Sequence, residues 1–216
     1  MGKDKIAVLD YGAGNLSSVQ NVLRHFGADF IVTSRPADVE AASTLIFPGD
    51  GEAAASMGEL RRTGLDEALT SFYASGRKML GICIGCQVIF SHSEERDTPC
   101  LGLLPGDVRR FARSSGLKVP HMGWNAVHFT IPHPVFDGLP QGSSYYFIHS
   151  YYPVPADPAL AAGETEYGET FVSAVASRNV VAVQFHPEKS GPVGLRLISN
   201  FLAWDGCWDA RGAGNA

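Results

Sequence analysis

The chain of 216 residues lacks the features that mark membrane proteins and nucleic-acid-binding proteins. No apolar run approaches the roughly 18 residues that a membrane-spanning helix needs. Its 17 lysine and arginine residues are outnumbered by 22 acidic residues, and the net charge of -5 leaves no basic surface for nucleic acid or for an acidic membrane. The balance of charge therefore favours small-molecule chemistry or a protein partner.

Cysteine is also scarce, with four residues, and no secretory leader pattern stands at the beginning of the sequence. A disulfide framework is therefore not expected, and the sequence predicts a reducing, cytoplasmic location. No linker rich in proline, serine and glycine divides the chain. We expect one domain over residues 1–216, with its core at about 5–204 and a mobile tail at 209–216.

Short apolar strands alternate with helical segments in the first part of the chain. The expected strands lie at 6–10, 30–33, 44–47 and 78–82, and the expected helices at 16–26, 36–40 and 60–73. This α/β alternation is typical of a doubly wound, mostly parallel central sheet with helices on both faces.

The second part of the chain has strands without helices between them, which predicts a smaller mixed or antiparallel sheet. The strands are expected at 108–111, 127–129, 145–152, 170–176 and 180–185. Residues 119–125 are expected to form an irregular loop, and a helix at 191–204 closes the fold.

The most informative stretch is residues 78–90, where a cysteine stands between an apolar strand and the expected start of a helix at 87–90. Gly81 and Gly85 lie two residues either side of Cys83, which is the glycine spacing of a strand-to-helix nucleophile elbow. Such a turn would raise the sulfur out of the sheet, near a helix N-terminus that favours the thiolate. The motif alone leaves open a buried core cysteine.

Two other motifs have weaker functional interpretations. Cys83 and Cys86 form a C-x-x-C pair, but no second pair follows to complete a zinc site, so Cys86 is expected to face the core. Gly12 and Gly14 resemble the beginning of a dinucleotide fingerprint, but Ser17 stands where the third glycine belongs. No metal and no cofactor is expected.

A cysteine nucleophile needs a base and a group that orients the base. His186 and Glu188 follow the strand at 180–185, which is expected to lie in the same sheet as the cysteine elbow. A carboxylate bonded to one ring nitrogen would leave the other nitrogen to face the sulfur. The remaining histidines outside the motifs are expected to have no catalytic part, on a helix or at the surface and in loops: His25, His92, His128 and His133.

A glycine turn, Pro48–Gly51, ends a neighbouring strand. Its backbone could aim amide hydrogens at an oxyanion, or the turn could be an ordinary strand-to-helix connection. The joint occurrence of this turn, the cysteine elbow and the His-x-Glu pattern predicts nucleophilic acyl chemistry.

These motifs resemble the triad (class I) glutamine amidotransferases. The stretches that carry the resemblance are Pro48–Gly51, Gly81–Gln87 and Gln184–Ser190. Further stretches resemble one branch of that family, the glutaminase subunits of imidazole glycerol phosphate synthases; they lie at 10–15, 118–125 and 146–151, and the resemblance as a whole runs from about Ile6 to Trp204.

The resemblance implies that Cys83 attacks the side-chain amide of L-glutamine, that His186 protonates the departing ammonia and that Glu188 orients His186. Water would then hydrolyse the glutamyl thioester to glutamate. The resemblance further implies an oxyanion site made by backbone amides, with a side chain beside it that positions substrate. The residues concerned are Gly49, Asp50 and Gly51 of the turn, Ile84, and Gln87 for the substrate. Because Asp50 stands where a small apolar residue is usual, its side chain is expected to point to solvent or to pair with a cation.

The resemblance also implies a partner, a β/α-barrel cyclase subunit that forms a heterodimer with this chain. Together they would make imidazole glycerol phosphate and an aminoimidazole carboxamide ribotide in histidine biosynthesis. The residues expected to face the partner are His121, Met122, Trp124, Asn125 and Lys189. The alternatives are a glutaminase of another synthase, a stand-alone cysteine hydrolase of the same fold, or a regulatory nucleotide-binding module of flavodoxin-like build.

Overall fold

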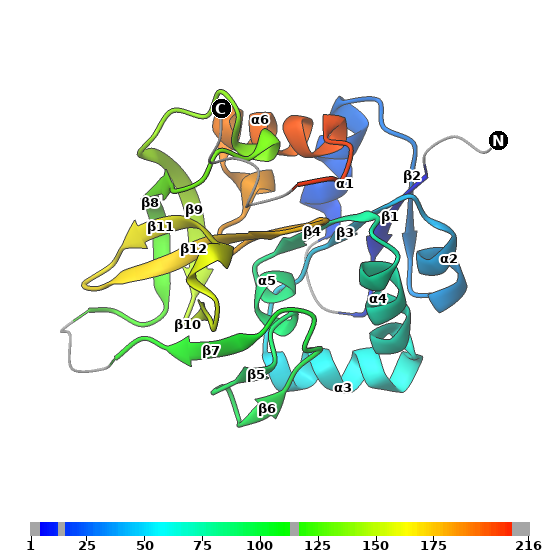
Figure 1. Cartoon of the computed structure of the whole chain (residues 1–216), viewed down its shortest axis with the longest axis horizontal. Helices are drawn as coiled ribbons and strands as arrows, with labels where there is room; N and C mark the ends of the chain where they lie inside the picture. The colour runs from blue at the N-terminus through cyan, green and yellow to red at the C-terminus, as the bar shows by residue number, and fades with distance from the viewer. Residues whose placement is uncertain (1–4, 13–15, 113–116, 209–216) are drawn as a thin grey trace.

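A computed structural model describes residues 5–12, 16–112 and 117–208 of the protein. Within these residues the strands form one sheet of nine strands and one of four (Figure 1). From edge to edge, the larger sheet contains β2 (Phe30–Thr33), β1 (Ile6–Leu9), β3 (Thr44–Phe47), β4 (Lys78–Ile82), β13 (Val180–Val183), β12 (Thr170–Ser177), β11 (Ala161–Glu166), β8 (His121–Phe129) and β9 (Ser143–His149). The smaller sheet contains β10 (Tyr151–Pro155), β7 (Gly106–Arg110), β5 (His92–Ser93) and β6 (Thr98–Pro99).

The larger sheet changes character at β13. Neighbouring strands from β2 to β13 are parallel, whereas those from β13 to β9 are antiparallel. The predicted α/β class with a smaller mixed sheet is confirmed. One feature differs from the prediction: most antiparallel strands of the second half extend the large sheet and do not form a separate one. Strands joined by a short connection without a helix can pair antiparallel with each other.

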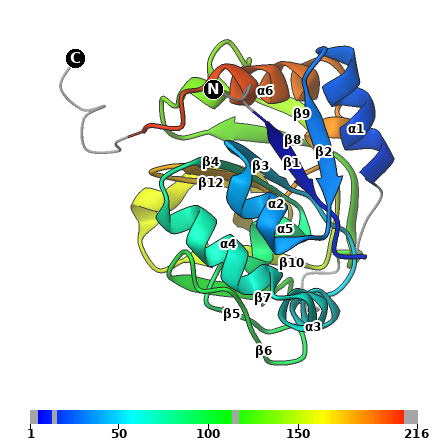
Figure 2. The same ribbon diagram turned by 90° about the vertical axis from the view of Figure 1, so that its right-hand side faces the viewer.

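Helices cover both faces of the parallel part of the sheet (Figures 1 and 2). One face carries α1 (Leu16–His25) and α6 (Gly191–Ala203). The other face carries α2 (Pro36–Ala41), α3 (Ala53–Thr63), α4 (Leu65–Ala74) and α5 (Ile84–Val88). Three short 3-10 helices complete the described elements: η2 (Pro134–Phe136), η3 (Pro158–Leu160) and η4 (Pro187–Lys189).

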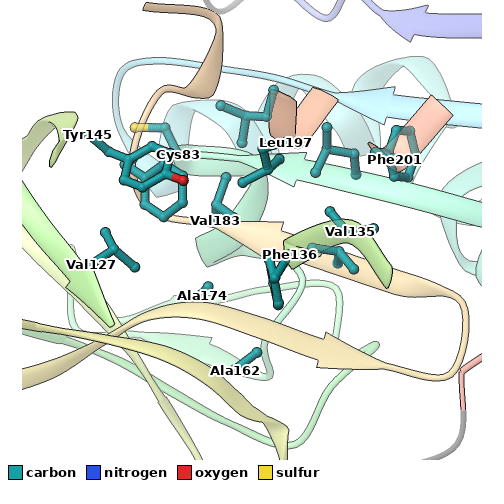
Figure 3. Close-up of a cluster of buried hydrophobic side chains, with 14 of the residues drawn as sticks. Cys83, Val127, Val135, Phe136, Tyr145, Ala162, Ala174, Val183, Leu197 and Phe201 are labelled. Carbon is teal, nitrogen blue, oxygen red and sulfur yellow. The ribbon is translucent and has the colours of Figure 1, made fainter. Parts of the chain in front are cut away.

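Strand periodicity divides the buried side chains into two cores. Ile6 and Val8 pack in the core under α1 and α6, whereas Ala7 and Leu9 pack in the core under α2 to α5. Successive residues of a strand point to opposite faces, so a strand that is apolar throughout has to be covered on both sides. Figure 3 shows part of the first core, in which Cys83 and Tyr145 are drawn toward one end of the cluster and Phe201 of α6 toward the other.

Several predicted element boundaries are wrong. The helix expected at 60–73 is two helices separated at Gly64, whose left-handed φ of 72° ends α3. The helix expected to begin at 87 begins at Ile84 and ends at Val88. The strand expected at 145–152 is broken at Ser150 into β9 and β10, which belong to different sheets.

The loop expected at 119–125 is also wrong, because β8 begins at His121. Along β8 the buried residues are His121, Val127 and Phe129. Gly123 and Asn125 hid this strand in the sequence, since both residue types are rare in strands. Strand β11 was missed for a similar reason, because Gly163 and two glutamates interrupt its apolar pattern.

None of the helices in the described ranges combines the length and the apolar character that a bilayer crossing requires. The tail predicted at 209–216 and residues 13–15 of the predicted glycine turn lie outside the described residues.

We predict opposite effects for two glycine-to-alanine substitutions in and after α3. Gly64→Ala places a Cβ in the left-handed region and should lower the free energy of unfolding by about 1 kcal/mol. Gly58→Ala, at an exposed position inside α3 with nothing within 4 Å of the new methyl group, should raise it by about 0.5 to 1 kcal/mol. Urea unfolding of both variants measures the two changes, and equal effects would contradict this account of the helix break.

Candidate active site

A strained backbone places Cys83 at the end of β4. Strand β4 ends at Ile82 and helix α5 begins at Ile84, so one residue makes the whole turn. Cys83 has φ 55° and ψ -108°, a combination that a residue with a side chain rarely adopts. Its N–H donates to the carbonyl of Val183 at 2.8 Å, and its own carbonyl accepts from the N–H of Cys86 at 2.9 Å. These bonds fix the turn from both sides.

The two glycines of the elbow are required by close backbone contacts. A Cβ on Gly85 would lie 2.0 Å from the carbonyl oxygen of Phe47, so α5 could not approach β3. A Cβ on Gly81 would lie 2.9 Å from the Cβ of Ala182 and 3.0 Å from the carbonyl oxygen of Gly85. The glycine spacing seen in the sequence therefore has a steric cause, since a side chain at either position would collide with the neighbouring chain.

Parallel pairing of β4 with β13 places His186 at the same edge of the sheet as Cys83. Val183 pairs with Ile82, so the residues after both strands leave the sheet together. His186 precedes η4, and its Nδ1 lies 2.8 Å from Oε1 of Glu188. The side chains of both residues are 4% exposed. The contact is therefore a shielded one, in which a charge interaction is stronger than in water.

The backbone of His186 is fixed independently of its ring. Its N–H donates to the carbonyl of Tyr146 at 2.8 Å. Its carbonyl accepts from the hydroxyl of Ser190 at 2.6 Å, and the Ser190 hydroxyl in turn accepts from the N–H of Tyr146 at 3.0 Å. No sequence pattern indicated this role for Ser190 or Tyr146, because all three contacts involve backbone atoms.

Opposing effects set the charge of His186. Burial lowers the pKa of its imidazole, but hydrogen bonding and charge interactions with Cys83 and Glu188 outweigh burial and raise the pKa to about 10. Nε2 is buried and has no hydrogen-bond partner of normal geometry among the described residues. This arrangement favours the imidazolium form of His186 at neutral pH.

The sulfur of Cys83 has two further polar neighbours. The carbonyl oxygen of Ile148 lies 4.0 Å from Sγ and can accept from the thiol. Nε2 of Gln184 lies 3.8 Å from Sγ and can donate to the thiolate. Gln184 is fully buried, and sequence reasoning missed it as a neighbour of the sulfur. Its polar character between two apolar strand residues was the available signal.

A cavity of about 240 Å³ opens beside Cys83. Cys83 itself is 6% exposed, so the cavity is its route to solvent. The predicted site residues that line it are Asp50, Gly51, Cys83, Ile84 and Gln87. Residues that the sequence analysis did not place there are Glu95, Pro120, Ile148, His149, Ser150 and Tyr151. Asp50 is exposed as well as bordering the cavity.

The glycine turn after β3 lies close to α5. A Cβ on Gly49 would lie 1.9 Å from the hydroxyl of Tyr11 and 2.2 Å from Cγ2 of Ile84, so only glycine allows this approach. Ile84 is the first residue of α5, and an N–H at that position has no acceptor inside the helix. Gly51 has a φ of 107°, which also favours glycine. The turn and the start of α5 can therefore present backbone amides to the same cavity.

Gln87 lies at the wall of the cavity with its side chain fixed. Its Nε2 donates to the carbonyl of Tyr151 at 3.1 Å and to Oε1 of Gln184 at 2.9 Å. Gln87 is 4% exposed. Cys86 is fully buried, as the sequence predicted, and burial raises the pKa of its thiol far above the usual range.

Two of the residues predicted to face a partner are strongly exposed. Met122 and Trp124 on β8 are 59% and 60% exposed. Ile148, which lies opposite Met122 on the neighbouring strand β9, is also exposed. Asn125 and Lys189 are half-buried. His121 was expected to face the partner, but its side chain is buried under the sheet and stacks on Phe147 and Tyr167. It faces inward because successive residues of β8 alternate between the faces of the sheet.

His133 also differs from the prediction, because it was expected at the surface and is buried. Its Nδ1 accepts from the N–H of Val135 at 3.1 Å and caps η2. Among the described ranges, no three side chains of histidine, cysteine, aspartate or glutamate are grouped so that they could hold a metal ion.

Comparison with known proteins agrees with this geometry. Residues 7–204 match the family described as glutamine amidotransferase class-I. The chain belongs to this family. Among curated relatives, the imidazole glycerol phosphate synthase subunit HisH of Aromatoleum aromaticum is 50% identical over 208 residues, covering 92% of this chain and 98% of the relative. The subunit of the same name from Thiobacillus denitrificans is 49% identical, with 93% and 91% covered.

Solved structures of glutamine amidotransferases share the fold of this family member. One crystal structure of a glutamine amidotransferase superposes with a TM-score of 0.69 at 21% identity, covering 92% of this chain and 97% of the other. A glutamine amidotransferase from Thermotoga maritima superposes with a TM-score of 0.65 at 16% identity, covering 92% and 82%. The architecture of the two sheets is therefore shared with proteins whose sequences have diverged widely.

We predict that Cys83→Ala lowers the pKa of His186 in this amidotransferase. The contacts with Cys83 and Glu188 raise that pKa to about 10 from the ordinary 6.5, and the substitution removes the sulfur while burial remains. A raised pKa means that the contribution of His186 to the free energy of unfolding is complete below pH 6.5 and is lost as the pH rises through about 10.

NMR titration of the imidazole nitrogens in the native chain and in Cys83→Ala measures this change. His133 is an internal control, because burial alone lowers its pKa to about 4 and it does not contact the cysteine elbow. An unchanged midpoint for His186 would show that the sulfur does not interact with the ring.

Proposed function

We propose that this chain is the glutaminase subunit of an imidazole glycerol phosphate synthase. The buried series of Cys83, His186 and Glu188 beside an open cavity carries the proposal. About half of the residues are identical to those of curated HisH subunits, almost over their full length, and this favours the histidine-pathway enzyme over other glutaminases.

The first chemical step forms a thioester. The Cys83 thiolate attacks the carbon of the glutamine side-chain amide, a C–S bond forms, and one C=O electron pair moves to oxygen. The backbone N–H of Ile84 and an N–H of the turn at Gly49 to Gly51 stabilise the negative oxygen. Loss of one such donor typically costs about 3 kcal/mol of transition-state stabilisation. The turn is therefore as important as the base.

His186 supplies the proton for the leaving group. As the tetrahedral intermediate collapses, the C–N bond breaks and the imidazolium gives its Nε2 proton to the departing nitrogen, which leaves as ammonia. The neutral imidazole then takes a proton from water, and the resulting hydroxide attacks the thioester. The C–S bond breaks, glutamate forms, and the thiolate is regenerated beside the imidazolium. Glu188 holds Nδ1 throughout, so that Nε2 faces the reacting atoms.

Ammonia would be protonated in bulk water, so it has to reach its acceptor through an enclosed route. A β/α-barrel cyclase subunit that docks on the exposed residues of β8 and β9 would provide the route. Support comes from the apolar patch of Met122, Trp124 and Ile148, because Ile148 also lines the cavity that contains Cys83. Large apolar side chains at this exposure are unusual without a partner. The four cysteines are all free, which fits a cytoplasmic location.

We predict that Cys83→Ala abolishes glutaminase activity, with a loss of at least about a thousandfold in kcat, because Cys83 is the one cysteine among the described residues that lines the cavity. The assay follows glutamate release from glutamine, with and without a cyclase subunit and its ribotide ligand. Cys207→Ala is the matched control, since Cys207 is free and exposed, and it should keep the native rate. Residual activity in Cys83→Ala would contradict the proposed nucleophile, and release that ignores the cyclase would favour a stand-alone hydrolase.

We predict that Trp124→Ala weakens binding of the cyclase subunit by at least about tenfold, because a large, exposed aromatic side chain at an interface centre often dominates affinity. Titration calorimetry with the isolated cyclase measures the dissociation constant. Phe26→Ala is the matched control, since Phe26 is an exposed aromatic residue just after α1 and outside the patch. Equal affinities for both variants would place the partner on another surface.

A further inference from the structure

Two buried histidines outside the proposed catalytic series face each other across β8 and β9. His121 and His149 are paired in the register of the two strands, and Nδ1 of His121 lies 2.9 Å from Nε2 of His149. Burial lowers the pKa of His121 to about 4 and that of His149 to about 3. Both rings are therefore neutral at physiological pH, and each has one nitrogen that donates and one that accepts.

The neighbours of the pair fix the direction of every hydrogen bond. Nδ1 of His149 lies 2.7 Å from the carbonyl oxygen of Tyr151, which can only accept, so this nitrogen carries the proton. Nε2 of His149 is then the acceptor, and Nδ1 of His121 donates to it. Nε2 of His121 accepts in turn from the side-chain amide of Asn125 at 3.3 Å. Each hydrogen bond is therefore donated in the same direction along the series, from Asn125 to His121, then to His149, then to the carbonyl of Tyr151.

The series continues from Tyr151 to the nucleophile. Its carbonyl oxygen accepts a second hydrogen bond, from Nε2 of Gln87 at 3.1 Å. The same amide nitrogen donates to Oε1 of Gln184 at 2.9 Å, which turns Nε2 of Gln184 toward the sulfur of Cys83 at 3.8 Å. Because Oε1 of Gln184 is held by Gln87, the Gln184 amide cannot flip without losing both contacts.

We propose that His121 and His149 are positioning residues for the nucleophile: through Tyr151, Gln87 and Gln184 they hold a hydrogen-bond donor against the Cys83 sulfur. The series begins on β8 at Asn125 and His121, which stand on either side of the exposed residues Met122 and Trp124 along the strand, and it ends at the sulfur of Cys83. A displacement of β8, the strand that carries Met122 and Trp124, would therefore move the Gln184 donor and change the reactivity of the Cys83 sulfur.

Packing alone does not require histidine at these positions. His121 and His149 lie among the rings of Phe111, Phe147 and Phe171, where phenylalanine would fit the aromatic surroundings without burying polar atoms. Two polar rings inside this cluster are useful only for the hydrogen bonds that they make.

The inference rests on the proposed function in one respect, that Cys83 is the nucleophile. The test measures the second-order rate of Cys83 alkylation by iodoacetamide in the full chain, together with kcat for glutamate release. His149→Phe keeps the ring volume but removes both hydrogen bonds, and we expect the alkylation rate and kcat to fall about three- to tenfold. His149→Asn keeps a donor near the position of Nδ1 and should restore part of the loss.

His133→Phe is the matched control, because His133 is equally buried, is also neutral and also lies among aromatic rings. It should lower the melting temperature without changing either rate. Should His149→Phe fail to fold, Gln184→Met removes the donor at the other end of the series and should give the same fall in alkylation.

Native rates in His149→Phe or in Gln184→Met would overturn the inference, as would an equal fall in His133→Phe. Failure of the proposed function is a different result, in which the native chain itself neither alkylates selectively at Cys83 nor releases glutamate.

Discussion

The strained backbone at Cys83 is the constraint on which the rest of the site depends. A residue with φ 55° and ψ -108° is stable only where its surroundings leave no alternative. Here β4 and β13 pair on one side, and Gly85 allows α5 to lie against the carbonyl of Phe47 on the other. The sulfur projects from the turn that results, so its position is set by backbone contacts of Cys83 itself and of Gly85.

The same sheet geometry assembles the groups that act on the sulfur. Parallel strands present their carboxyl ends at one edge, so β3, β4 and β13 place the glycine turn, Cys83 and His186 together, although more than a hundred residues separate the first from the last in the sequence. Burial then makes the chemistry possible, because a His186–Glu188 pair in water would gain little from its charges. With side chains only 4% exposed, the pair can hold a proton that the ring alone would lose.

The sequence predicted the parts of the site whose cause is local. The glycines around Cys83 and the His-x-Glu spacing follow from a single turn each, and both were identified without coordinates. Gln184 and the inward-facing His121 and His149 were not identified as parts of one connected series, because their contacts depend on which strands are neighbours and in which register. Strand β8 shows the difficulty clearly, because its glycine and asparagine suggested a loop. Its antiparallel pairing with β9, from His121 opposite His149 to Val127 opposite Ser143, supplies the strand contacts that override this local preference.

Strand β8 presents two kinds of surface because a strand has two faces. Its outer face exposes Met122 and Trp124, and its inner face buries His121 against His149. Successive side chains of a strand point to opposite faces of the sheet, so the exposed apolar patch and the buried pair of histidines lie one residue apart along β8. Any displacement of the strand must move both sets of side chains, since the backbone between them is held in a hydrogen-bonded ladder with β9.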